Sequence, residues 1–376
     1  MPWIMRGLTQ IAGSNRFETS DGAVIRESLD LCFQITLLKS GTRQGQGLFF
    51  ESKIFRGWYG GMMLLWLLLF TLLNSIPFLL AHWHYPAIMV LGAFVAGLTP
   101  EGGGAVAFPV LSIFFDIERE MARDFSLMIQ SIGMTSASVW ILTRKGVRLS
   151  IYASVLWFLP LGFVGFVLGM LLLQAIPVFI IQALFLSLIL TFALAYTWGK
   201  HRGSEPVLVI KGRGDKALLA CALIVGGLCA SLFGTGADII LYTVLVTRFR
   251  MDEKVGTHMS IMLMAAISLF GYAYRFFWDG AITDYQIRTW LCAYPVVLLM
   301  APFGSYILQK LNVEWMLRGV VALNIFQMVY FNLKNPTWEK LAWSCASSVI
   351  LFTIFWIALT HLAGRRPSKP PAEPSS

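Results

Sequence analysis

Pro100-Glu101-Gly102-Gly103-Gly104 interrupts an apolar run at residues 86–115, and Gly234-Thr235-Gly236-Ala237-Asp238 interrupts a second at 217–247. Each glycine in a helix interior is about 1 kcal/mol less favourable than alanine, so a cluster of them ends a helix. We therefore expect each run to form two half-helices of about 12–16 residues that meet at the glycine break.

The two interrupted runs resemble each other. When the chain is shifted by 134 residues, nine of the 37 positions from 92 to 128 are identical, and the two glycine breaks coincide. Broken helices at corresponding positions of two halves are typical of the binding site of a transporter. The pattern therefore predicts an internal repeat with a site at the breaks.

The composition predicts a polytopic membrane protein. Of the 376 residues, 57% are hydrophobic and 13% are charged, whereas about 25% are charged in a soluble protein. This composition excludes a disordered chain and a disulfide-stapled secreted domain. The net charge of +9 does not indicate a nucleic-acid partner, because an excess of Lys and Arg in a membrane protein reflects its orientation in the membrane. The five cysteines form no C-x-x-C pair, and we expect neither a metal site nor a cofactor.

Eight further apolar runs are long enough to cross a hydrocarbon core of ~30 Å, which takes ~20 residues. They lie at 61–80, 126–142, 151–174, 178–198, 257–274, 289–309, 314–333 and 341–362.

The distribution of Lys and Arg favours re-entrant hairpins over spanning segments for the two interrupted runs. With a cytoplasmic N-terminus and two hairpins, 22 Lys and Arg lie inside and 6 outside, whereas two full spans would give 16 and 12. The positive-inside rule favours the first arrangement. Each repeat then has one hairpin and three spanning helices, an odd number, so the second repeat is inverted relative to the first.

The predicted fold is all-α, with two inverted repeats, each a glycine-broken re-entrant hairpin plus three transmembrane helices, and one extra helix before and after them. The expected boundaries are a cytoplasmic polar extension at 1–57, an extra helix at 58–85, repeat 1 at 86–200 with its hairpin at 86–115, a basic cytoplasmic linker at 201–216, repeat 2 at 217–334 with its hairpin at 217–247, a last helix at 335–364 and a disordered tail at 365–376.

The start of the second half-helix in each hairpin is a candidate anion site. Free backbone N–H groups and the positive end of the helix dipole favour a bound anion, although glycines there could instead serve close helix packing. Polar side chains from the helices that follow could add hydrogen bonds. The candidate substrate-binding residues are Gly102, Gly103, Gly104, Thr235, Gly236, Ala237, Gln130 and Ser260.

Glu101 and Asp238 are acids at the breaks. An ionisable residue at membrane depth predicts a function, and either acid could carry a coupling proton; the alternative is plain capping of a helix N-terminus. Two weaker candidates are His258, which could titrate near neutral pH, and Arg318, which could pair with substrate or with Glu314 four residues before it.

The residues around the breaks resemble a known family. Gly92-Ala93-Phe94-Val95-Ala96-Gly97, then Glu101-Gly102-Gly103-Gly104, then Phe108-Pro109-Val110-Leu111, are similar to the first signature of the TauE/SafE (TSUP) sulfite exporter family. The second copy, from Gly226 to Leu245 and on through Met251-Asp252-Glu253-Lys254-Val255-Gly256-Thr257, resembles the repeat of that family. The resemblance covers roughly 86–333 and implies a secondary transporter for sulfur-containing anions in the cytoplasmic membrane.

We therefore expect a secondary active transporter, coupled to protons, that moves sulfite or a sulfonate across the cell membrane. We expect both termini to be cytoplasmic. The expected partners are a small inorganic or organosulfur anion, protons and the lipid bilayer, and the chain could also form a homo-oligomer. No enzymatic constellation such as H-E-x-x-H or a P-loop occurs. The alternatives are a cation or metal carrier that uses Glu101 and Asp238, and a non-transporting scaffold whose residues 1–57 bind a partner.

Overall fold

The computed structural model describes residues 49–198, 205–210, 212–310 and 313–361. Most of the predicted N-terminal extension, part of the predicted linker and the predicted tail lie outside these residues. The chain divides into two units after Gly47, and the description below concerns the second, Leu48–Ser376. Within the described ranges the secondary structure is helical, apart from one isolated bridge between Glu205 and Met251.

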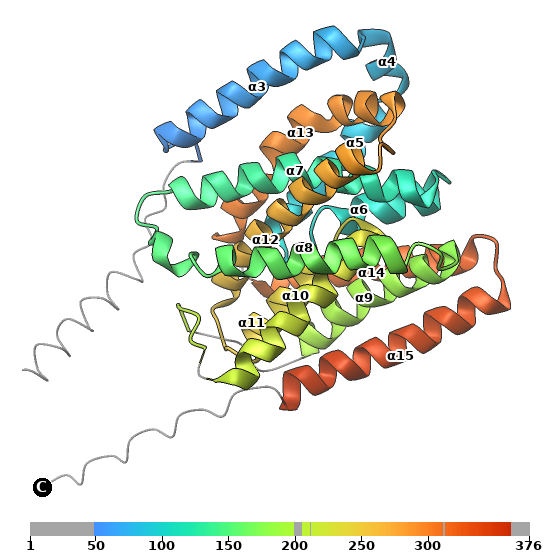
Figure 1. The fold of residues 1–376 in the computed structure, drawn as a ribbon. Helices are drawn as coiled ribbons and strands as arrows, with labels where there is room; N and C mark the ends of the chain where they lie inside the picture. Colours follow the sequence, from blue (N-terminus) through green and yellow to red (C-terminus); the bar gives the residue numbers. More distant parts are fainter. Residues whose placement is uncertain (1–48, 199–204, 211, 311–312, 362–376) are drawn as a thin grey trace, which may run out of the picture. The chain divides into compact units, whose positions relative to one another are not determined.

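The helices follow the chain in the order that Figure 1 shows from blue to red. They are α3 (Lys53–Leu73), α4 (Ile76–Ala81), α5 (His84–Leu98), α6 (Gly104–Pro109), the π-helix η1 (Val110–Phe114), α7 (Arg119–Thr143), the 3₁₀-helix η2 (Leu149–Ile151), α8 (Val155–Leu172), α9 (Val178–Trp198), α10 (Arg213–Phe233), α11 (Ala237–Thr247), α12 (Glu253–Ala273), the π-helix η3 (Tyr274–Trp278), α13 (Asp284–Leu308), α14 (Val313–Leu333) and α15 (Trp338–His361).

In the described part of the chain, eight helical segments are long and apolar enough to cross a membrane, by length and composition. These are 53–73, 119–143, 149–172, 178–195, 213–233, 253–278, 284–308 and 338–358. Seven of them overlap predicted spans, so the all-helical membrane architecture is confirmed. The predicted run at 314–333 coincides with α14, Val313–Leu333. The segment at 213–233 is the first half of the second broken run.

The prediction for the first helix was wrong at its boundaries. We expected a span at 61–80, but α3 begins at Lys53 and ends at Leu73. The side chain of Ser52 accepts a hydrogen bond from Phe55 N at 3.2 Å and caps the helix start, which an apolar run does not reveal. Asn74 leaves the helical conformation at the other end.

The first half of the second hairpin is also longer than predicted. Helix α10 has 21 residues because it continues through a polar first turn. There Asp215 Oδ1 lies 2.8 Å from Nη2 of Arg248, at the end of α11. The start and the end of the broken run therefore lie together, and the run is a hairpin.

The first broken run closes in the same way. The ring of His84 at the start of α5 stacks on Phe115, just after η1, with ring centroids 5.1 Å apart. Helices α6 and η1 continue directly into each other, so this hairpin consists of α5, a break and a second helical arm from Gly104 to Phe114.

Helices of the two halves pack in equivalent pairs. Helix α5 packs against α13 and, equivalently, α10 packs against α8; α7 packs against α12, and α9 against α14. Helices α7 and α12 begin at Arg119 and Glu253, which are 134 positions apart. If each helix of one half is replaced by its equivalent in the other half, each of these four packed pairs becomes another of them or stays the same, as an internal repeat requires. The inversion of the repeats in a bilayer stays a prediction.

The innermost helices are α7 and α12. In their most apolar windows 72% of residues are buried, against 6% for α3 and 17% for α15. Most exposed side chains in the middle of these two outer helices are apolar, such as Leu64 and Ile354. An apolar outer surface of this kind suits contact with lipid rather than water.

Candidate functional site

The first break has a conformation that only glycine adopts readily. Helix α5 ends at Leu98, and Thr99 Oγ1 accepts a hydrogen bond from Glu101 N at 3.3 Å. Gly102 then turns the chain with a φ of +73°, a region in which a Cβ is unfavourable. Helix α6 starts two residues later, as the glycine cluster predicted.

The second break uses two glycines with positive φ, Gly234 at +75° and Gly236 at +104°. Helix α11 begins directly after them, and Asp238 lies in its first turn. Oδ1 of Asp238 accepts hydrogen bonds from Gly236 N and Ile239 N, both at 3.1 Å. Asp238 is not the N-cap residue, which is Gly236, but one of its two carboxylate oxygens satisfies two backbone N–H groups at the start of α11.

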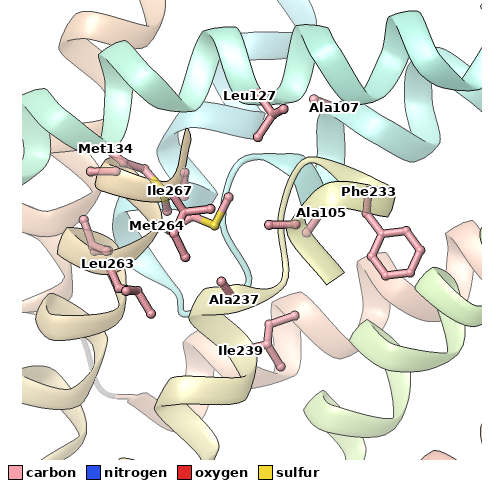
Figure 2. Packing of buried hydrophobic residues seen from close by; sticks show 14 of the residues in the cluster. Ala105, Ala107, Leu127, Met134, Phe233, Ala237, Ile239, Leu263, Met264 and Ile267 are labelled. Carbon is pink, nitrogen blue, oxygen red and sulfur yellow. The ribbon is translucent and has the colours of Figure 1, made fainter. Parts of the chain in front are cut away.

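The two breaks meet each other. A methyl group at Gly102 would lie 2.6 Å from Thr235 Oγ1 and 3.0 Å from Gln130 Oε1, and would overlap Asp238 Oδ2. A methyl group at Gly104 would lie 2.5 Å from Thr235 Cβ. Figure 2 shows the two break loops side by side, with Ala105 and Ala237 labelled at the starts of α6 and α11. We call this region, where residues 99–104 contact 234–238, the hairpin tips.

Gln130 of α7 holds the hairpin tips in place. Its Nε2 donates to Gly234 O at 2.7 Å and to Ser126 O at 3.1 Å, while its Oε1 lies 3.4 Å from Thr235 Oγ1. A cavity of about 10 Å³ beside Gln130 and Gly103 is otherwise lined by apolar residues of α5, α7 and α13. That volume holds about one water molecule, so the tips are closely packed in this conformation.

Glu101 is 1% exposed and is held by α14. Asn324 Nδ2 donates to both of its carboxylate oxygens, at 2.9 and 3.2 Å, and to Ile189 O at 3.1 Å. One turn further, Gln327 Nε2 donates to Ala105 O at 3.2 Å. Asn324 and Gln327 were missed from sequence, although two amides three residues apart in an apolar run were a usable signal.

Three acceptor oxygens, one in the hairpin tips and two on the adjoining α14, are buried without a hydrogen-bond partner among the described residues. They are Asp238 Oδ2, Asn324 Oδ1 and Gln327 Oε1. A buried acceptor that lacks a donor costs about 1–3 kcal/mol. Such a site gains free energy from a proton, a cation or a ligand that brings donors.

Some of the predicted residues lie elsewhere or are used internally. Ser260 Oγ donates to Thr257 O within α12 at 2.9 Å. His258 is buried, and its Nδ1 lies 3.1 Å from the hydroxyl of Tyr152, in the segment that leads into α8. Arg318 is exposed on α14, so the structure does not bring it to the hairpin tips.

Gly103 and Ala237 lie within the tips as predicted. A methyl group at Gly103 would be 3.3 Å from Ala96 Cβ of α5, and Ala237 is 1% exposed at the first position of α11. Of the ten principal candidates, the structure brings together nine: Glu101, Gly102, Gly103, Gly104, Gln130, Thr235, Gly236, Ala237 and Asp238.

Two hairpins that meet around buried acids, inside a bundle of membrane-capable helices, define a class: the polytopic membrane transporters built on broken helices. The match to known families is more specific. The family model for Sulfite exporter TauE/SafE covers residues 85–331, and the chain belongs to this family. The matched range contains both hairpins and ends within α14. No curated protein and no solved structure matched the chain.

Membership confirms the family resemblance of the two glycine breaks. The family is one of sulfite exporter-type transporters for sulfur anions, which places this chain among membrane transport proteins.

Proposed function

We propose that this protein is a proton-coupled secondary active transporter for a small sulfur-containing anion such as sulfite or a sulfonate. The observation that carries the proposal is the meeting of the two hairpin tips, where Gly102 faces Thr235 and Asp238. Two helix starts from opposite repeats, each with the positive end of its dipole, then meet in one region. At the second of them Asp238 holds the N–H groups of Gly236 and Ile239. That arrangement suits an oxyanion.

Asp238 supplies a reason for coupling. Its carboxylate already occupies Gly236 N and Ile239 N, the amides that a substrate oxygen would use. An ionised Asp238 therefore competes with the anion, and protonation weakens its hold on those amides. Glu101, which is equally buried on the other tip, is the alternative carrier of the proton.

Transport requires the hairpin tips to move, because the cavity beside them is about 10 Å³. The inverted repeat offers the means: one repeat rocks against the other around a fixed site. We propose the cytoplasmic membrane as the location, with both termini in the cytoplasm. Labelling of a cysteine at the exposed position 120, within 119–123, from the cytoplasmic side would contradict this topology and the inversion of the repeats.

The test is counterflow of radiolabelled sulfite in proteoliposomes, with sulfonate, sulfate and chloride as competitors. We expect saturable exchange that sulfur oxyanions block and chloride does not. Asp238→Asn and Glu101→Gln are compared with Asp215→Asn, an acid outside the tips that pairs with Arg248. The variant that keeps exchange but loses proton-driven uptake identifies the coupling residue; absence of exchange with every sulfur oxyanion would refute the proposal.

One observation favours a second candidate, a cation carrier. Asp238 Oδ2, Asn324 Oδ1 and Gln327 Oε1 are buried acceptors without donors, and oxygen acceptors of this kind are ligands for hard cations. Within the described residues, no group of three His, Cys, Asp or Glu side chains could hold a metal. Uptake of labelled sodium that Glu101→Gln abolishes, without sulfite exchange, would support this candidate.

A further inference from the structure

One face of α7 leads from its first turn to the hairpin tips. Arg119, Arg123, Ser126 and Gln130 are spaced by four, three and four residues, which places them in one row along a helix. Gln130 donates to Gly234 O at the tips, and Arg119 is the first residue of α7. Eleven helical residues cover about 16 Å, so the row connects an end of the helix with the proposed substrate site.

Two arginines of this row converge on a single neutral oxygen. Nη1 of Arg123 donates to Gln174 Oε1 at 2.6 Å, and both Nη atoms of Arg119 lie 3.4 Å from that same atom. Gln174 belongs to the turn between α8 and α9, where its Nε2 donates to Gly169 O. Arg119 and Arg123 are 5% and 0% exposed, so two guanidinium groups are withdrawn from water here.

The acids nearby are already engaged by another arginine. Asp124 is buried, and it accepts from Arg123 Nε at 2.9 Å and from Arg275 Nη2 at 2.9 Å. Arg275 also reaches Asp279 at 2.7 Å. These contacts form an ion-pair network in which Asp124 accepts hydrogen bonds from both Arg123 and Arg275.

The two arginines of the row retain hydrogen-bonding capacity. Arg119 pairs with Glu120, whose side chain is 51% exposed and therefore well solvated. Nη2 of Arg123 is buried and approaches Asp124 Oδ1 at 2.9 Å, but makes no hydrogen bond. Buried guanidinium groups are stabilised by an anion that accepts two parallel hydrogen bonds, and a neutral amide oxygen provides less.

We propose that Arg119 and Arg123 form an anion-binding subsite for a small sulfur oxyanion, separate from the hairpin tips. Its bound oxygen takes the position of Gln174 Oε1, and the Gln174 side chain turns away from the two guanidinium groups. Planar guanidinium groups match the oxygens of sulfite, sulfate or a sulfonate. That the anion then moves along α7 to Gln130 rests on the proposed transport function; the binding itself does not.

The repeat shows that the subsite belongs to one end of the bundle. The positions of α12 that align with Arg119 and Arg123 at the shift of 134 residues hold Glu253 and Thr257. The equivalent row on the other repeat therefore carries no arginine. The subsite therefore concentrates the anion at the end of the bundle where α7 begins. For this reason the apparent affinity for the anion differs between the two directions of transport.

The test measures binding of radiolabelled sulfate to the purified full-length protein in detergent at low ionic strength. We expect Arg119→Gln to weaken binding by about tenfold or more, because a charge-assisted contact is lost. Gln174→Glu places a tethered carboxylate between the arginines, so it is expected to weaken sulfate binding as strongly while raising the unfolding temperature. Arg248→Gln removes an ion pair elsewhere and serves as the control.

Sulfate binding by Arg119→Gln and Gln174→Glu at wild-type affinity would overturn the subsite, as would a lower unfolding temperature for Gln174→Glu. If Arg119→Gln weakened sulfate binding no more than the control Arg248→Gln does, the subsite would also be overturned. Sulfate binding that depends on Arg119, together with absence of sulfite exchange in proteoliposomes, would preserve the subsite and refute the proposed function. Sulfite exchange whose KM is unchanged in Arg119→Gln from both sides of the membrane would support the proposed function and refute the passage of the anion from this subsite to Gln130.

Discussion

Replacing Gly102 with alanine tests the meeting of the two hairpins at its closest point. The φ of +73° costs a non-glycine residue about 1–2 kcal/mol. The added methyl would lie 2.6 Å from Thr235 Oγ1 and overlap Asp238 Oδ2, and overpacking of this kind costs about 1–3 kcal/mol. We therefore expect Gly102→Ala to lower the free energy of unfolding by about 2–5 kcal/mol, the sum of the backbone cost and the overpacking cost.

The control separates the two costs. Gly280 also has a positive φ, +59°, but a methyl group there would meet no atom within 4 Å. Gly280→Ala is therefore expected to lose about 1–2 kcal/mol through its backbone alone. The free energy of unfolding is measured in mixed micelles by the fluorescence of the 13 tryptophans.

The same pair of variants has a functional consequence. We expect Gly102→Ala to reduce sulfite exchange because it forces the tips apart, and Gly280→Ala to exchange normally. Equal losses of stability in the two variants would refute the contact between the breaks. Wild-type exchange by Gly102→Ala would refute the assignment of the substrate site to that contact.

Three further outcomes are expected. Asn324→Leu removes the donor to Glu101, so it should cost about 1–3 kcal/mol and lower exchange, whereas Asn324→Gln should retain part of both; an unchanged variant would separate Glu101 from α14. Gly97→Ala places a methyl group against the main chain of α13 and should destabilise by at least about 1–3 kcal/mol in micelle unfolding, and a neutral result would contradict the close packing of α5 on α13. Asp215→Asn breaks a pair in which Arg248 is 39% exposed, so the loss should be below about 1 kcal/mol with exchange retained; a loss of several kcal/mol would mean that the pair does more than close the hairpin.

The positions of the breaks were predictable because glycine acts on the local backbone. Gly102, Gly234 and Gly236 all have positive φ, a preference that belongs to the residue and needs no knowledge of its surroundings. The 134-residue repeat then predicted that the two breaks correspond, and symmetry implied that they could meet. Most of the candidate substrate residues followed from this reasoning.

The surroundings of the acids were not predictable in the same way. Asn324 binds Glu101 across 223 positions of the chain, and such a contact depends on how α14 packs against the first hairpin. Arg318, only six residues earlier, was a weaker candidate, named because of its charge, and it is exposed. The start of α3 was missed for a local reason, since Ser52 begins the helix before the apolar residues do.

The exchange of partners between the halves has a consequence for biosynthesis. Helix α5 is complete at Leu98, but α13, against which it packs, begins at Asp284. At about 5–20 residues per second, the ribosome takes on the order of 10–40 s to produce the intervening chain. Throughout that interval the first hairpin lacks α13, and Glu101 at its tip also lacks Asn324 of α14. A nascent chain that stalls before Asp284 would therefore present an acidic, unpartnered loop to the insertion machinery and its quality control.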